Sequence, residues 1–343
     1  MKRVLIRTHG GERIGLGHLM RCLSIAKGLK RYAKTVRFEV EWIVNREAIP
    51  LLEAEGFRAK AAERFSNQEE GLFEGEKPDV ILLDAYGAGN PYLSFLKTRA
   101  KTLILIDDNN DQYASADVDA VINGNIHARG LPYADTLPRA ERWVGPEFLA
   151  MKEEYWETED SDAPVPGNVL VTVGGADPLR LMEPLARALE PYPGQKTLII
   201  GPAFGQPETE RLEALFFRGY ELAIAPRSLK PHIRRAEVAL TAAGSTIYEV
   251  LRLGRIPVLF ELAENQRQIA RVLEGAGIPN LGWHAQLTAE RVFETVSQTV
   301  ARRAQAYERC QPLFSLYDGQ GVRRLVNAIE TLLSETATGN ANF

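Results

Sequence analysis

A histidine and an arginine follow a glycine-rich stretch near the N-terminus. Gly15 and Gly17 lie within the three residues before His18, and Arg21 follows one helical turn later. Glycines between a strand and a helix let backbone N–H groups approach a ligand closely. The positive end of a helix dipole helps to keep an imidazole neutral, so His18 is a candidate base and Arg21 could face an anionic substrate. The stretch lacks the third glycine of a dinucleotide fingerprint and the Lys-Ser/Thr of a P-loop, which disfavours a dehydrogenase.

Carboxylate and amide side chains stand where three apolar runs end. They are Asp84 with Tyr86, Asp107 with Asp108, and Asn123 with Asn125. Ligands of open parallel sheets bind beyond the carboxyl ends of the strands, so we expect a polar pocket there. The alternative is that these residues only cap helices and form turns. A metal site from Asp84, Asp107 and Asp108 is conceivable, but no helical metal-ligand motif accompanies it, and we expect neither metal nor cofactor.

The second half of the chain repeats the pattern of a strand followed by small residues. Its candidates for substrate binding are Gly174, Gly175, Gly244, Ser245, Thr246, Glu249, Asn265 and Gln266. Small residues at a helix start can hold a phosphate on free N–H groups, and the Glu249 carboxylate could accept hydrogen bonds from ribose hydroxyls. The alternative for Thr246 and Glu249 is a capping box, which stabilises a helix by about 1 kcal/mol without any ligand.

Short apolar runs that alternate with helical patterns predict an α/β protein with parallel sheets. We expect strands at 3–7, 41–44, 80–83, 103–106 and 120–122, then at 169–173, 197–200, 222–225, 238–240 and 257–260, with helices at 289–303 and 321–333. The polar segment 158–167, with Pro164 and Pro166, is the expected linker. The expected domains are therefore 1–157 and 168–335, with a flexible tail at 336–343 and a ligand-binding cleft between the domains.

Composition excludes several classes of protein. The 343 residues are 45% hydrophobic and 25% charged, and their net charge is −4, so no global basic field points to nucleic acid. Two distant cysteines, Cys22 and Cys310, indicate no disulfide scaffold or zinc cluster. No apolar run approaches the length of a membrane span. We expect a soluble cytoplasmic protein, a monomer or weak dimer, with no integral membrane segment and no nucleic-acid partner.

Taken in order, these motifs resemble one known family. The stretch 14–23 resembles the glycine–histidine–arginine signature of the pseudaminic acid pathway UDP-sugar hydrolases and of their relatives, the spore coat polysaccharide proteins of the SpsG type. The resemblance continues through 84–87, 107–108, 123–125, 145–148, 174–177, 243–249 and 265–266. It spans about residues 1 to 280 in the same order.

The resemblance implies a GT-B-like architecture of two Rossmann-like domains, with the nucleotide held mainly by the C-terminal one. It implies hydrolysis of UDP-2,4-diacetamido-2,4,6-trideoxy-β-L-altropyranose to UDP and the free sugar, without a metal. By this resemblance His18 is the catalytic base and Tyr86 lies near the reacting centre. We expect Asp84 to be a catalytic residue as well. The loop Gly244-Ser245-Thr246, Glu249 and Gln266 match the diphosphate, ribose and nucleotide–sugar contacts.

The chain departs from the family pattern at two positions and at its C-terminal end. His9 stands where the family usually has an aspartate, and Ala85 stands where the hydrolases tend to carry a polar side chain. The segment 318–321 before a helix resembles the longer spore coat group. Two alternatives stay open: a UDP-sugar glycosyltransferase, in which an acceptor hydroxyl replaces water, and a nucleotide-sugar-binding subunit without catalysis.

Overall fold

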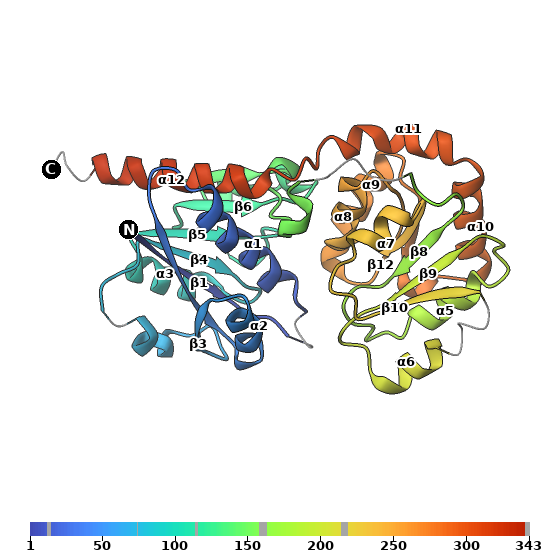
Figure 1. The fold of residues 1–343 in the computed structure, drawn as a ribbon. Helices are drawn as coiled ribbons and strands as arrows, with labels where there is room; N and C mark the ends of the chain where they lie inside the picture. Colours follow the sequence, from blue (N-terminus) through green and yellow to red (C-terminus); the bar gives the residue numbers. More distant parts are fainter. Residues whose placement is uncertain (12–14, 74, 114–115, 158–162, 214–218, 340–343) are drawn as a thin grey trace. The chain divides into compact units, whose positions relative to one another are not determined.

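The computed structural model describes the chain except residues 12–14, 74, 114–115, 158–162, 214–218 and 340–343. The chain forms two compact units, which we describe separately (Figure 1). The N-terminal unit comprises Met1–Glu153 together with Gly319–Phe343, and the C-terminal unit comprises Glu154–Asp318. The prediction of two α/β domains is confirmed.

The N-terminal unit is built on a parallel sheet. Its described strands lie in the order β3-β2-β1-β4-β5-β6-β7. They are β1 (Lys2–Thr8), β2 (Phe38–Val44), β3 (Arg58–Ala61), β4 (Val80–Asp84), β5 (Thr102–Ile106), β6 (Ala120–Asn123) and β7 (Glu141–Val144). The central strands β4 and β5 are buried along their whole length, as expected for a sheet covered on both faces. The edge strands β3 and β7 escaped prediction because they are short and largely polar.

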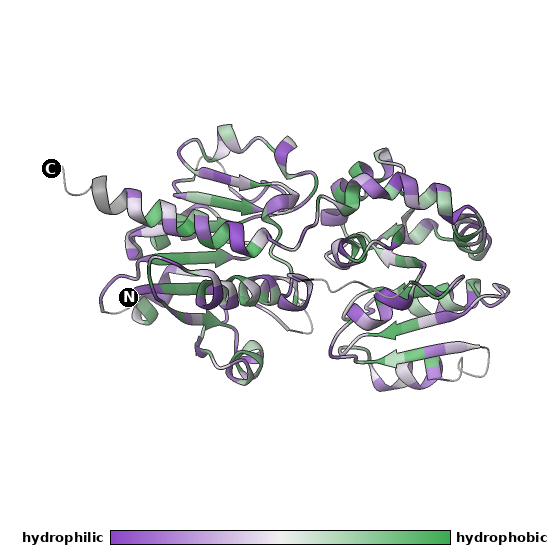
Figure 2. Ribbon diagram, turned by 45° about the horizontal axis from the view of Figure 1, so that its top comes forward, coloured by the Kyte–Doolittle hydropathy of each residue, from purple (hydrophilic) through white to green (hydrophobic). Residues whose placement is uncertain are grey.

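Helices cover this sheet. They are α1 (Gly17–Tyr32), α2 (Ile49–Ala54), α3 (Asn90–Arg99), α4 (Tyr133–Thr136) and α12 (Gly321–Gly339). The apolar face of α1 is buried, with Leu19, Cys22 and Ala26 each 0% exposed. Figure 2 shows the strands as the most hydrophobic elements, whereas the helices mix hydrophilic and hydrophobic residues.

The C-terminal unit contains a second parallel sheet. Its described strands lie in the order β10-β9-β8-β11-β12-β13. They are β8 (Val169–Thr172), β9 (Lys196–Ile200), β10 (Tyr220–Ile224), β11 (Val238–Ala242), β12 (Ile256–Glu261) and β13 (Asn280–Trp283). This is the doubly wound order, in which the direction of strand addition reverses next to the first strand. The short strand β13 escaped prediction because Gly282 interrupts its apolar pattern.

The helices of the C-terminal unit are α5 (Met182–Ala188), α6 (Gln206–Glu213), α7 (Lys230–Arg235), α8 (Thr246–Arg252), α9 (Arg267–Gly275), α10 (Ala289–Ala301) and α11 (Arg303–Phe314). The helix expected at 289–303 is therefore α10, and α11 follows almost directly. No helix in the described part of the chain has both the length and the apolar character that a membrane span requires.

The structure divides the chain at other residues than the sequence suggested. The boundaries fall after Glu153 and Asp318, and part of the expected linker, 158–162, lies outside the described residues. The helix α12 was expected in the C-terminal domain, but it packs beside α1 in the N-terminal unit (Figure 1). It also continues to Gly339, through part of the expected tail.

Candidate functional site

The candidate site of the N-terminal unit lies where the strand order reverses, between β1 and β4. Thr8 pairs with Asp84, and Asp84 pairs with Ile106, so these three strands end in line. His18 is the second residue of α1, which follows the loop after β1. Asp107 and Asp108 directly follow β5. Side chains from three separate chain segments therefore meet at the edge where such sheets bind ligands.

Asp84 orients the imidazole of His18. Asp84 Oδ1 lies 2.6 Å from His18 Nδ1, and the two side chains are 0% and 9% exposed. Arg21 Nη2, a donor, also lies 3.1 Å from His18 Nδ1, but the Asp84 carboxylate, which can only accept, is closer, so we assign the proton to Nδ1 and the lone pair to Nε2. Burial alone would raise the pKa of Asp84, but the adjacent Arg21 guanidinium and His18 lower it below its usual range. The arrangement can therefore accept a proton at His18 Nε2.

Arg21 joins two buried carboxylates. Its Nε and Nη2 donate to Asp84 at 2.5 and 2.6 Å, and its Nη1 donates to Asp108 Oδ1 at 2.7 Å. Burial opposes the charge of Asp108, but Arg21 and the Tyr86 hydroxyl hold the pKa of Asp108 far below its usual range. The guanidinium is thus engaged by protein carboxylates, and these contacts give Arg21 a positioning role. The expectation that it faces an anionic substrate gains no support from them.

Asp108 connects the remaining predicted residues to this cluster. The Tyr86 hydroxyl donates to Asp108 Oδ2 at 2.6 Å, and Asn125 Nδ2 donates to Asp108 Oδ1 at 2.8 Å. Asn123 Nδ2 donates to the backbone carbonyl of Asp108 at 2.9 Å. The rings of Tyr86 and His18 are nearly perpendicular, with a centroid distance of 4.4 Å and an interplanar angle of 85°. Tyr86 is therefore held next to the imidazole while it stays 41% exposed.

Asp107 belongs to a different set of contacts. Its Oδ2 accepts from the Tyr133 hydroxyl and, at 2.8 Å, from the backbone N–H of Asn110. Burial is the main cause that raises the pKa of Asp107 to about 6. Since Asp84 and Asp108 share Arg21 whereas Asp107 binds Tyr133, the three carboxylates do not converge as metal ligands. Among the described residues, no group of three or more His, Cys, Asp or Glu side chains is arranged to hold a metal ion.

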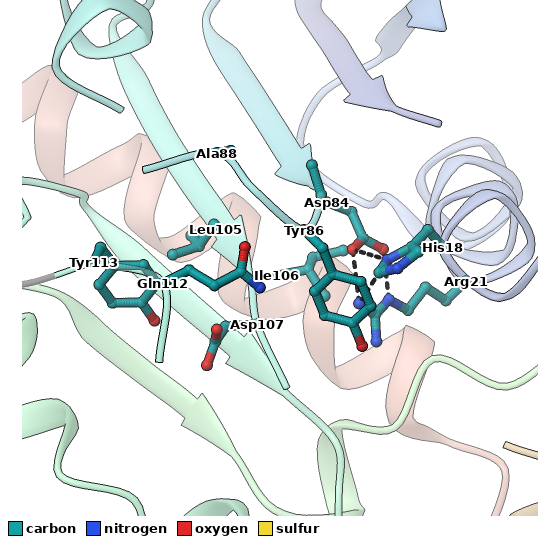
Figure 3. Close-up of a pocket in the computed structure, with 11 residues that line it drawn as sticks. His18, Arg21, Asp84, Tyr86, Ala88, Leu105, Ile106, Asp107, Gln112 and Tyr113 are labelled. Carbon is teal, nitrogen blue, oxygen red and sulfur yellow. Dashed lines mark hydrogen bonds and ion pairs between the residues drawn. The ribbon is translucent and has the colours of Figure 1, made fainter. Parts of the chain in front are cut away.

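A narrow pocket lies between these two sets of contacts (Figure 3). Its polar lining comes from His18, Arg21, Asp84, Tyr86, Asp107, Gln112 and Tyr113, and its apolar lining from Ala85, Ala88, Leu105 and Ile106. Sequence reasoning missed Gln112, Tyr113 and Tyr133, because none of them directly follows an apolar run. The departure at Ala85 falls on the pocket wall.

The departure at His9 is absorbed by packing. His9 is 8% exposed, its Nε2 lies 2.9 Å from the carbonyl oxygen of Ala62, and its ring stacks on Phe65 at 4.2 Å. Burial and the nearby Arg7 lower the pKa of His9. Gly15 has a φ of +84°, which favours glycine, and it pairs with the backbone of Gly11. Neither His9 nor the glycine loop contributes a described hydrogen bond to the His18 cluster.

In the C-terminal unit, the Gly174-Gly175 loop follows β8 at the corresponding reversal of strand order. Asp177, just after it, accepts from the backbone N–H groups of Leu181 and Met182 and so caps the start of α5. The loop packs closely on Gly201, where a Cβ atom would lie 2.4 Å from the carbonyl oxygen of Gly175. Gly174 has a φ of +111°, another position that favours glycine.

The structure brings Gly244 and Gln266 together at one edge of this unit. A Cβ atom at Gly244 would lie 3.4 Å from Gln266 Nε2, while Gln266 Oε1 accepts from the N–H of Leu262 at 2.9 Å. Asn265 lies in the same short turn, Glu264–Gln266. The buried Glu249 Oε2 accepts from the Tyr155 hydroxyl at 2.9 Å.

The capping-box alternative for Thr246 and Glu249 is wrong. Ser245, not Thr246, is the cap residue of α8, and its side chain makes no capping hydrogen bond. Glu249 is instead tied to Tyr155 of the segment that enters the C-terminal unit. Sequence reasoning could not find this contact because the partners are 94 residues apart.

Comparisons with known proteins were made by sequence and by structure. No model of a protein family matches the chain. Spore coat polysaccharide biosynthesis protein SpsG of Bacillus subtilis is 24% identical over 351 residues, which cover 96% of this chain and 98% of SpsG. UDP-2,4-diacetamido-2,4,6-trideoxy-beta-L-altropyranose hydrolase of Campylobacter jejuni is 21% identical over 254 residues, which cover 73% of this chain and 88% of that enzyme.

Two solved structures illustrate the likeness in fold. MurG of Acinetobacter baumannii has a TM-score of 0.67 at 17% identity and covers 96% of this chain and 100% of its own. The calicheamicin glycosyltransferase CalG4 has a TM-score of 0.64 at 15% identity and covers 97% of this chain and 98% of its own. Both are GT-B glycosyltransferases. The chain therefore has the GT-B fold, and it is similar in sequence to SpsG and to the UDP-diacetamido-altropyranose hydrolase, the family that its motifs resemble.

Proposed function

We propose that this protein is a UDP-sugar enzyme of polysaccharide biosynthesis and, more specifically, a hydrolase that releases UDP and a free acetamido sugar. The observation that carries the proposal is the buried Asp84–His18 pair at the carboxyl edge of the N-terminal sheet. The names of the two homologues support the substrate class. His18 acts as the base, and Tyr86 lies beside it at the reacting centre.

The proposed reaction needs only one proton acceptor. A water oxygen attacks the anomeric carbon of the sugar, the water proton passes to His18 Nε2, and UDP departs with the electrons of the broken C–O bond. Asp84 keeps the proton of the neutral imidazole on Nδ1, so Nε2 is the atom that can take up another. It also stabilises the imidazolium that forms, as the carboxylate of a catalytic triad does.

The cluster can balance the positive charge that develops on His18 during the reaction. Two carboxylates, Asp84 and Asp108, surround one guanidinium, Arg21. With neutral His18 the four side chains carry one net negative charge, and with protonated His18 they are neutral. Because the cluster is buried, a favourable charge balance is worth more there than in water.

The nucleotide is assigned to the C-terminal unit. Gly244, Ser245 and Thr246 are proposed to contact the diphosphate, Glu249 the ribose, and Gln266 both nucleotide and sugar. Support comes from the family resemblance and from the way Gly244 and Gln266 lie together at the carboxyl edge of β11 and β12. Gly174, Gly175 and Asn265 are proposed to complete this binding surface.

The test is UDP release from UDP-2,4-diacetamido-2,4,6-trideoxy-β-L-altropyranose without any acceptor. We expect steady release by the unaltered protein and a loss of about 10²–10⁴-fold in kcat for His18→Ala, the usual contribution of general acid–base catalysis. Asp84→Asn should lower kcat as well, since an amide no longer fixes the Nδ1-protonated tautomer. The control is His232→Ala, which changes a half-buried histidine in the C-terminal unit.

Binding of UDP separates loss of catalysis from loss of fold. His18→Ala should bind UDP with unchanged affinity, because the nucleotide is assigned to the other unit. Absence of UDP release from the unaltered protein, with UDP still bound, would sink the hydrolase proposal for this sugar. Release that His18→Ala leaves intact would remove His18 from its role.

A glycosyltransferase is the second candidate, and the solved structures of similar fold favour it. One base and one UDP site serve both reactions, with an acceptor hydroxyl in place of water. Addition of candidate carbohydrate acceptors to the same assay distinguishes them. A transferase requires the acceptor for UDP release and yields a new glycosidic bond, whereas a hydrolase releases UDP at the same rate with or without it.

A further inference from the structure

Half of the pocket in the N-terminal unit is not used by the proposed proton transfer. His18, Arg21 and Asp84 line one side, and Asp107, Gln112 and Tyr113 line the opposite side beyond Tyr86 (Figure 3). Ala85 and Ala88 are small apolar residues in the lining of the same pocket. A wall with hydrogen-bonding groups next to small apolar side chains fits a substituent that is itself part polar and part methyl.

Gln112 is held in one orientation. Its Oε1 accepts from the backbone N–H of Gly87, which has a φ of +82° in the turn after Tyr86. This contact fixes which end of the amide is oxygen, so Nε2 is the end left to donate into the pocket. Gln112 therefore provides a pre-oriented donor.

Asp107 is held just as firmly, but as an acceptor. One oxygen, Oδ2, is fixed by the Tyr133 hydroxyl and the N–H of Asn110, so the carboxylate cannot rotate freely. The Tyr113 hydroxyl is buried beside the Asp107 carboxylate, and burial together with this carboxylate raises the pKa of Tyr113. Asp107 and Tyr113 therefore form one polar wall next to the donor of Gln112, and such a wall suits a ligand with both donor and acceptor groups.

We propose that this pocket recognises an acylamino group of the sugar. Asp107 accepts from its N–H, Gln112 Nε2 donates to its carbonyl oxygen, and its methyl group packs on Ala85 and Ala88. Asp107 and Gln112 are thus specificity-determining residues of the N-terminal unit. The inference rests on the proposed function in taking a sugar nucleotide as the ligand, but it concerns binding and not turnover.

The test compares sugar nucleotides that differ in a single substituent. The probes are the UDP-diacetamido sugar and two analogues in which one acetamido group, at C2 or at C4, is replaced by hydroxyl. Affinities are measured by calorimetry in a His18→Ala background, which prevents hydrolysis during the measurement. We expect one of the two replacements to weaken binding at least about 10-fold, because it leaves buried polar groups of the site unpaired.

Two variants change the hydrogen-bonding groups that the pocket offers to a ligand but keep the contacts that hold these side chains in place. Gln112→Glu keeps an acceptor for Gly87 but loses the donor, and Asp107→Asn keeps an acceptor for Tyr133 and Asn110 but offers an amide instead of a carboxylate. In each variant the preference for the acetamido probe should fall to within about 3-fold, while the affinity for UDP alone stays unchanged. The control is Gln68→Glu, an exposed glutamine outside the pocket.

The outcomes separate this inference from the proposed function. Equal binding of all three probes, or a preference that survives both variants, overturns the acylamino pocket even if UDP is released. A preference that both variants abolish supports the pocket even if the unaltered protein releases no UDP, in which case only the hydrolase proposal fails.

Discussion

Arg21 is the residue on which the geometry of the N-terminal site depends most. Its planar guanidinium donates to both Asp84 and Asp108, which holds Asp84 beside His18 and Asp108 beside Tyr86. A guanidinium has donors at fixed angles, so it can position two carboxylates where a lysine could not. Its charge also lowers the pKa of both carboxyl groups against the opposing effect of burial. At this scale the site is two buried carboxylates that share one guanidinium, with an imidazole hydrogen-bonded to Asp84.

Asp107 predicts an unusual pH dependence of stability. An aspartate in the unfolded chain loses its proton near pH 4, whereas burial keeps Asp107 protonated in the fold until about pH 6. A rise of pH across this window therefore favours the unfolded chain, and the free energy of unfolding should fall by about 1–3 kcal/mol on account of this group. Asp107→Asn, which cannot ionise, should remove that decline.

The measurement is urea unfolding at several pH values between 3.5 and 7, chosen to bracket the usual aspartate range of about 4 and the raised one. Asp84 and Asp108 act in the opposite direction, because their lowered pKa values stabilise the fold above pH 4 and lose that effect in acid. The difference between the unaltered protein and Asp107→Asn cancels their contribution. A difference that stays constant across the pH range would contradict the assignment.

At the scale of elements, the turn after β6 links the cluster to the rest of the unit. Asn123 and Asn125 bind the backbone and side chain of Asp108, and Gly124 lies between them. A Cβ atom at Gly124 would lie 2.4 Å from Leu149 Cα, which is backbone and cannot rotate away. The glycine is therefore required by close approach, and it fixes the position of both amide side chains.

Gly124→Ala should destabilise the N-terminal unit by about 1–3 kcal/mol, the usual cost of overpacking. It should also lower UDP release more than the stability loss explains, because Asn125 would shift away from Asp108. Gly130→Ala is the matched control, since a Cβ atom there would meet nothing within 4 Å. Urea unfolding and the UDP-release assay measure the two effects. If both variants have the same free energy of unfolding and the same rate of UDP release, Leu149 can move to make room for the Cβ atom without destabilising the unit.

At the scale of the whole molecule, the chain returns to its first unit. The helix α12 buries Val322, Leu325, Val326 and Ile329, each at most 2% exposed, and packs beside α1. Val322 lies so close to Gly28 that a Cβ atom on residue 28 would be 2.1 Å from Val322 Cγ1. Glu330 accepts from the backbone N–H groups of Lys34, Thr35 and Val36, which follow α1. The N-terminal unit is therefore complete only with the last helix of the chain.

Removal of residues 319–343 should destabilise the N-terminal unit selectively. The amides of α1 and β2 should lose protection from hydrogen exchange, because the apolar face of α1 and the residues that follow it lose their cover, whereas β8 to β13 should keep theirs. A chain that lacks only residues 340–343 is the control. Unchanged protection of α1 in the longer truncation would mean that α12 adds little to this unit.

The sequence by itself determined the alternation of strands and helices, the two parallel sheets, and most of the residues at their carboxyl edges. These features are local: an apolar run of Val, Ile and Leu predicts a buried strand such as β4, and a polar residue at its end, such as Asp84, is visible at once. The edge strands β3 and β7 and the glycine-containing β13 lack such runs, so they stayed hidden.

Only the tertiary structure decided which of these residues act together. Arg21 meets Asp84 and Asp108, which are 63 and 87 residues away, and Asp107 turns to Tyr133 although it adjoins Asp108 in the chain. The partner of His18 Nδ1, the tie between Glu249 and Tyr155, and the return of α12 are likewise long-range. The physical reason is that such pairs depend on strand order, which decides the chain segments that lie side by side and which the spacing of residues along the chain does not encode.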